Sequence, residues 1–115
     1  MMHRAVYLGV ALALVTGCGR LISPEPEQLV NMGRFDEAIE VCTQSIRANP
    51  RDAGAYLYRG RAYHCRNSGD DLQRAIADFT ESISIAPKEP EAYYSRALAY
   101  RDLGDTEKSA ADEAF

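Results

Sequence analysis

The sequence predicts an all-α protein in which a solenoid of about three helix–turn–helix units follows a cleaved signal peptide. Three observations carry this prediction. An apolar run near the N-terminus ends at a cysteine, two long segments recur at a fixed offset, and their apolar residues step by three and four. The 115 residues suffice for one domain, and the interspersed charges, with a net charge of −4, are typical of an ordinary globular chain.

Residues 1–17 have the features of a bacterial signal peptide. Arg4 supplies the positive charge, and residues 5–15 are apolar. As a helix this run would be about 16 Å long, roughly half the hydrocarbon thickness of a bilayer, which disfavours a permanent transmembrane helix. The run ends in Val15-Thr16-Gly17-Cys18, which resembles a bacterial lipobox: an aliphatic residue and two small residues before a cysteine.

The lipobox resemblance implies cleavage just before Cys18 and attachment of a lipid to its thiol. Two or three acyl chains hold a protein stably at a membrane, whereas a single chain anchors it only marginally. Residues 18–24 would then form a lipidated linker. Gly19 stands where an inner-membrane retention signal commonly has Asp, so the outer membrane is favoured if the host is Gram-negative. The alternative is that Cys18 merely ends an ordinary signal peptide.

The rest of the chain contains an internal repeat. Ala55 and Ala92 begin one pair of matching segments, and Ala38 and Ala75 begin another; in each pair the two copies are 37 residues apart. Two unrelated segments would rarely agree in this way twice. The repeat therefore predicts stacked copies of one supersecondary unit, each of which buries its apolar face only against its neighbours.

Proline and glycine mark the boundaries of these units. Pro50 and Pro87 each follow a helical pattern that cannot continue past them. The predicted units are residues 25–52, with a short first helix, residues 53–89, and residues 90–115, a truncated unit that caps the array. The glycines that separate the two helices of each unit are Gly33, Gly69 and Gly104.

The order of residues in the middle unit resembles the tetratricopeptide repeat, in which an aromatic residue, a Gly, a Tyr, an Ala-x-x-x-Phe pair and a Pro follow one another. The family repeat has about 34 residues, so the offset of 37 assigns three extra residues to the turn at residues 66–71. Small residues at helix contacts are expected at Gly60, Ala97, Ala38 and Ala75. The residues that carry the resemblance are Tyr56, Arg59, Gly60, Tyr63, Ala75, Phe79 and Pro87.

The resemblance also implies a binding surface, because the first helices of such repeats line a concave groove that binds proteins or peptides. The alternative is that these positions are simply solvated helix faces. The set that clamps a terminal carboxylate in some family members is absent, since its positions hold Leu57, Arg61 and Ser95. By position, the groove residues are Leu57, Tyr58, Arg61, His64, Tyr94, Ser95, Leu98 and Arg101.

Other chemistries find little support in the sequence. No basic stripe is present, so nucleic acid is not an expected partner, and no cofactor is implied. His64 and Cys65 are adjacent and would point about 100° apart on a helix, so they do not form a nucleophile and base, and a metal site that includes Cys42 is equally disfavoured. For Cys42 and Cys65 two possibilities stay open: a disulfide, or a buried Cys42 and a free Cys65.

Three functions are therefore considered. The first is a lipid-anchored adaptor in the bacterial cell envelope that recruits a protein or peptide through its groove. The second is an assembly factor for an outer-membrane or envelope complex, similar to small helical pilot lipoproteins. The third, an envelope hydrolase, is disfavoured because the sequence contains no catalytic constellation.

Overall fold

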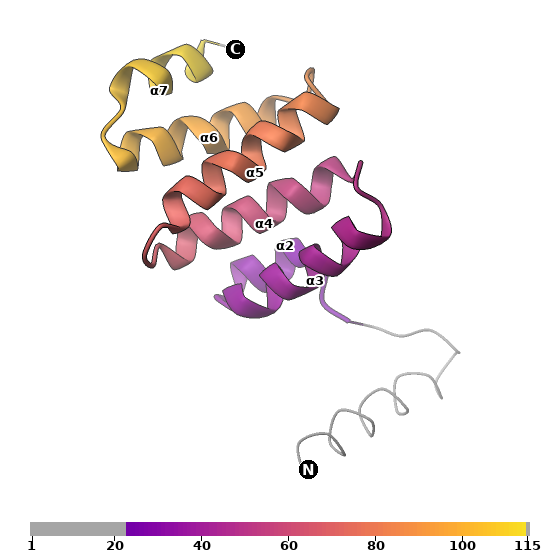
Figure 1. The fold of residues 1–115 in the computed structure, drawn as a ribbon. Coiled ribbons are helices and arrows are strands. Elements are labelled where there is room, and N and C mark those ends of the chain that lie inside the picture. The colour runs from indigo at the N-terminus through magenta and orange to yellow at the C-terminus, as the bar shows by residue number, and fades with distance from the viewer. Residues whose placement is uncertain (1–22, 115) are drawn as a thin grey trace, which may run out of the picture.

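The computed structural model describes residues 23–114, and within that range it contains six α-helices and no strand. Consecutive helices form helix–turn–helix pairs, and the pairs stack from α2 and α3 at one end to α7 at the other (Figure 1). This arrangement confirms the predicted all-α repeat fold. The helices are α2 (Pro26–Asn31), α3 (Phe35–Ala48), α4 (Ala53–Arg66), α5 (Asp71–Ile85), α6 (Pro90–Leu103) and α7 (Thr106–Glu113).

Proline and glycine mark helix boundaries as the sequence predicts, except at the end of α4, which is capped by a left-handed Asn67 and not by Gly69. Pro26 and Pro90 lie in the first turns of α2 and α6, where proline's missing N–H leaves no hydrogen bond unmade. Gly33 and Gly104 follow α2 and α6 with positive φ angles, a backbone conformation that glycine adopts without steric cost. The first helix, α2, has only six residues, in agreement with the short helix expected there.

Small residues let α4 and α5 approach closely. A Cβ atom built on Gly60 would lie only 2.6 Å from Cε1 of Phe79, so the ring of Phe79 occupies the space that a side chain at position 60 would need. Phe79 is fully buried in the core that α4, α5 and α6 share. The other expected small contacts, Ala38, Ala75 and Ala97, are also fully buried.

An ion pair that recurs in two units joins the two helices of its unit, and its arginine also donates a hydrogen bond to the preceding unit. Arg59 of α4 donates from Nε and Nη2 to the two carboxylate oxygens of Asp78 on α5, at 2.8 Å each. Its Nη1 donates to the hydroxyl of Thr43 on α3 at 3.2 Å. Burial raises the pKa of the Asp78 carboxyl despite this partner. The same arrangement recurs one unit later in Arg96, Asp112 and Thr80.

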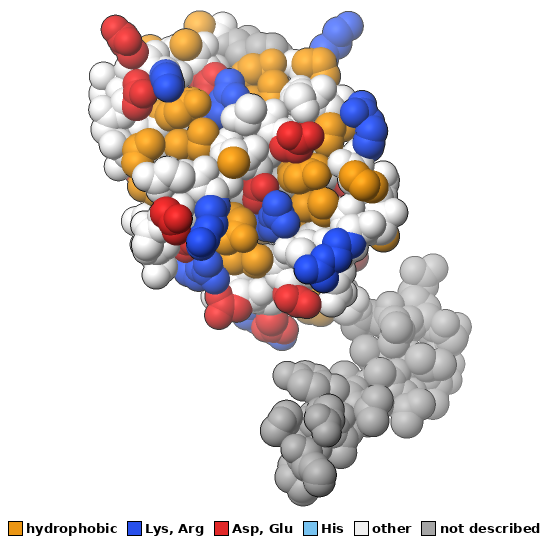
Figure 2. Space-filling view, in the orientation of Figure 1, with side chains coloured by type: hydrophobic (Ala, Val, Ile, Leu, Met, Phe, Trp, Pro, Cys, Tyr) orange, Lys and Arg blue, Asp and Glu red, His pale blue; other side chains and the backbone are white. Residues whose placement is uncertain are grey.

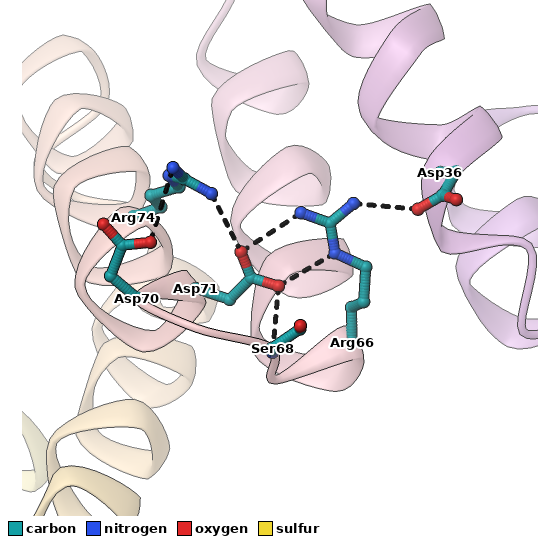
Figure 3. Close-up of polar contacts among 6 residues, drawn as sticks. All are labelled: Asp36, Arg66, Ser68, Asp70, Asp71 and Arg74. Carbon is teal, nitrogen blue, oxygen red and sulfur yellow. Dashed lines mark hydrogen bonds and ion pairs between the residues drawn. The ribbon is translucent and has the colours of Figure 1, made fainter.

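The extra residues of the middle unit lie between α4 and α5 and are held by a buried carboxylate. Asp71, which is fully buried, accepts hydrogen bonds from the guanidinium of Arg66, the backbone N–H of Ser68 and Arg74 (Figure 3). Arg66 also reaches Asp36 on α3 at 2.8 Å. These donors lower the pKa of Asp71 to about 2, with Arg66 as the main cause. The insertion is therefore an ordered turn tied to two helices.

Replacing Asp71 by Asn should lower the free energy of unfolding at neutral pH. It should also make that free energy depend less on pH in the acidic range. Breaking a buried ion pair costs roughly 3–5 kcal/mol; because the Arg66 side chain is 33% exposed, we expect about 2 kcal/mol of lost unfolding free energy at neutral pH. The pKa of Asp71 is lowered on folding, so its contribution is complete above about pH 4 and is lost as the pH falls through about 2.

The measurement is urea denaturation of both proteins between neutral and acidic pH, with Asp70→Asn as the matched control. The Asp70 side chain is 67% exposed, and its ion pair within residues 23–114 is with Arg74, at 3.3 Å, so this change should stay within about 0.5 kcal/mol. Equal stabilities of the two variants would show that the Asp71 network does not stabilise the turn.

Candidate functional site

A groove crosses the first helices of all three units and contains most of the predicted binding residues. Its pocket has a volume of about 340 Å³ and lies between α2, α4 and α6. Its lining is completed by three residues that were not predicted: Val30 and Asn31 of α2 and Cys65 of α4. The predicted residues that line this pocket are Arg61, His64, Tyr94, Ser95 and Leu98.

A second pocket, of about 230 Å³, continues the surface toward the N-terminal ends of α4 and α6. Leu57 and Tyr58 line this second pocket together with Glu89 and Glu91. We call it the Glu91 pocket. Its two glutamates were not predicted, although they lie next to the proline that begins α6.

Three of the predicted groove residues differ from the expectation. Leu57 is only 7% exposed and belongs to the core cluster around Phe79, so no more than an edge of its side chain faces the Glu91 pocket. Ser95 is 5% exposed and presents little more than its hydroxyl. Arg101 is exposed but lines neither pocket. Tyr94, by contrast, is 61% exposed and is the most open aromatic ring in the groove.

Hydrogen bonds and a cation–π contact order the polar side chains of the groove. The hydroxyl of Tyr58 donates to Glu27 of α2 at 2.5 Å, and this bond is the first cause of a pKa raised to about 12. The guanidinium of Arg61 lies 5.4 Å from the centre of the Tyr58 ring, and its Nε donates to Ser95 at 3.4 Å. The groove therefore holds a cation that is stacked on an aromatic ring and still has donors available.

His64 links the second and third units at the far end of the groove. Its Nε2 lies 2.7 Å from an Asp102 carboxylate oxygen on α6. Asp102, which follows Arg101 directly, was not among the predicted groove residues. The pair bridges α4 and α6 where these two helices make few other contacts.

The cysteines of the described region are both free thiols. Cys42 is fully buried on α3, where burial raises its pKa to about 11, whereas Cys65 is exposed beside the groove. The disulfide alternative is therefore not formed. Burial also raises the pKa of Cys65, which keeps the thiol protonated at neutral pH and disfavours a nucleophilic role. No group of three or more potential metal ligands is present among residues 23–114.

The face shown in Figure 2 carries no patch of a single charge. Positive and negative side chains alternate across it, with apolar side chains between them. The expected signal peptide and the lipidation site Cys18 lie outside the described residues. Of the helices in residues 23–114, none has the length and apolar character that a membrane span requires.

Comparison with known proteins gives consistent matches. The sequence model of the tetratricopeptide repeat matches residues 28–90 and, in a second overlapping match, residues 66–114. Protein FlbA of Caulobacter vibrioides is 38% identical over 84 residues, which are 73% of this chain and 14% of that protein. The TPR repeat-containing thioredoxin TDX of Arabidopsis thaliana is 32% identical over 85 residues, 74% of this chain and 22% of that protein.

The Sol locus transcriptional repressor of Clostridium acetobutylicum is 28% identical over 81 residues, 69% of this chain and 24% of that protein. The chain thus spans less than a quarter of the length of each of these relatives. Their names describe different activities, so what the similarity establishes is the shared repeat.

Proposed function

Since this chain belongs to the tetratricopeptide repeat family, whose repeats mediate protein–protein interactions, we propose that it is a membrane-anchored adaptor that recruits a protein through the groove of α2, α4 and α6. The observation that carries the proposal is the convergence of three units on one pocket. Arg61, Tyr94 and Leu98 combine there a cation, an exposed ring and an aliphatic surface. Arginine and aromatic side chains of this kind are enriched among the residues that dominate binding energy.

The membrane part of the proposal rests on the lipobox-like segment that ends at Cys18. A lipid on this cysteine would hold the repeat domain at the surface of a bacterial envelope membrane, the outer membrane where the host has one. Residues 18–24 would be the tether that separates the lipid from α2. An adaptor and an assembly factor share this architecture, and they differ in whether the partner stays bound or is released after it has been delivered.

Arg61→Ala should weaken partner binding without unfolding the protein. We expect a loss of about 1–2 kcal/mol of binding free energy, because the side chain offers donors and a stacked cation to the groove. The free energy of unfolding should change by about 0.5 kcal/mol or less, since Arg61 pairs with no carboxylate among the described residues.

The partner is first captured from detergent-solubilised envelopes, and its affinity is then measured for the wild type, Arg61→Ala and Glu40→Ala. Glu40 is exposed on α3, outside both pockets, and serves as the control. If Glu40→Ala loses binding while Arg61→Ala binds like the wild type, the partner uses the other face and the groove proposal fails.

A further inference from the structure

Arg61 differs from the other partly buried arginines of the described region in having no carboxylate partner. Each of the others makes at least two hydrogen bonds to the carboxylate of one aspartate. Arg61 has only the long hydrogen bond to the Ser95 hydroxyl and the contact with the Tyr58 ring. The three paired arginines are Arg59, Arg66 and Arg96.

Two glutamates at the start of α6 also have no ion-pair partner among residues 23–114. They are Glu89 and Glu91, which border the Glu91 pocket. On α6, Glu91 precedes Ser95 by four residues, so the two occupy the same face about one turn, or 5.4 Å, apart. Since Ser95 contacts Arg61, Glu91 lies about one turn before the residue of α6 that Arg61 reaches, and both charges act on the hydroxyl of Tyr58.

The Tyr58 side chain lines the Glu91 pocket and lies close to both charges. Its ring lies against the guanidinium of Arg61. The negative charges of Glu27 and Glu91 both raise the pKa of its hydroxyl. Because its hydroxyl already donates to Glu27, the ring offers mainly an apolar edge to an occupant. A bound segment would therefore pass over the Tyr58 ring, with one charged side chain reaching Arg61 and the other reaching Glu91.

We propose that the groove binds an extended segment of its partner that carries an acidic and a basic side chain two residues apart, the acidic one on Arg61 and the basic one on Glu91. In an extended chain two residues span about 6.6 Å and place both side chains on one face, which matches the spacing of one helical turn. This inference rests on the proposed function and specifies the partner's chemistry. The carboxylate comes from a side chain and not from a chain terminus. The reason is that pocket-lining residues lie on both sides of Arg61, in the Glu91 pocket on one side and toward His64 on the other.

The test uses fluorescein-labelled synthetic peptides that share one uncharged sequence and differ only at the two charged positions. A leucine next to the acidic position is included to contact Leu98. The pairs compared are Lys and Glu, Glu and Glu, Lys and Lys, and Gln and Gln. Anisotropy titrations with the full-length protein in mild detergent should rank the Lys and Glu peptide about five-fold tighter than any other.

Reversing the charge of the pocket should reverse this preference. Glu91→Lys should make the Glu and Glu peptide the tightest ligand, whereas the control Glu40→Lys should keep the wild-type ranking; circular dichroism checks that both variants are folded. Equal binding of all four peptides, or an unchanged ranking in Glu91→Lys, would overturn the charge pairing and leave the adaptor function standing. Binding of none of them would overturn both.

Discussion

Gly60→Leu is expected to lower the free energy of unfolding by about 3 kcal/mol, the upper end of what overpacking a core usually costs. The reason is the ring of Phe79, whose Cε1 and Cδ1 atoms lie 2.6 and 2.8 Å from where a Cβ on residue 60 would be. Phe79 is fully buried and cannot move aside without shifting α5. The measurement is the urea midpoint of the full-length protein.

Gly54 provides a control on the same helix. A Cβ there would meet only the Asp52 side chain, at an ordinary 3.6 Å. Gly54→Ala should therefore stabilise the protein by up to about 1 kcal/mol through the higher helix propensity of alanine. An unchanged midpoint in Gly60→Leu would mean that α4 and α5 do not pack in the way described. Partial rescue of Gly60→Ala by Phe79→Leu would locate the clash at that ring.

Cys18→Ala is expected to abolish lipid labelling and to leave an unprocessed precursor. Processing and lipid attachment both require the thiol if the segment that ends at Cys18 is a lipobox. The measurement is metabolic labelling with a radioactive or clickable fatty acid, together with the electrophoretic mobility of the protein. Cys65→Ala is the matched control, because it removes an exposed thiol of the repeat domain and should leave labelling unchanged. Normal labelling of Cys18→Ala would refute the anchor.

The fold was predictable because its determinants are local in sequence. The residues before Pro50 and Pro87 cannot continue a helix, and the helices do end there. Gly60 and Ala75 could be assigned to close contacts because the repeat shows small residues where helices of one unit meet. The insertion could be placed between α4 and α5 because the spacing from Tyr63 to Gly69 exceeds that in the next unit.

The ion pairs were not predictable in the same way, because each joins residues from different helices. Arg59 was identified only as part of the repeat pattern and Asp78 was assigned no role, because only the packing of α4 on α5 brings the two together. A signal was present, since Thr43 and Thr80 recur at the repeat offset and each accepts from the arginine of the following unit. Asp71 is a stronger case: nothing in a polar turn sequence indicates a fully buried carboxylate.

The groove was predictable by helix position but not by side-chain direction. Leu57 and Tyr58 are neighbours that point about 100° apart, so a list by position included both although Leu57 belongs mainly to the core. The same geometry explains Arg101, which lies outside the pockets while the next residue, Asp102, pairs with His64. Glu91 was missed because the family resemblance suggested no role for the first turn of α6.

The central claim is that a partner protein binds in the groove of α2, α4 and α6, and site-specific photo-crosslinking tests it most directly. A photoreactive phenylalanine analogue is placed either at Tyr94, the exposed ring of the groove, or at Glu40 on α3, in the full-length protein within its own host cells. Irradiation should yield a discrete adduct from position 94 and none from position 40. An adduct from position 40 alone would place the partner on the opposite face and contradict the claim.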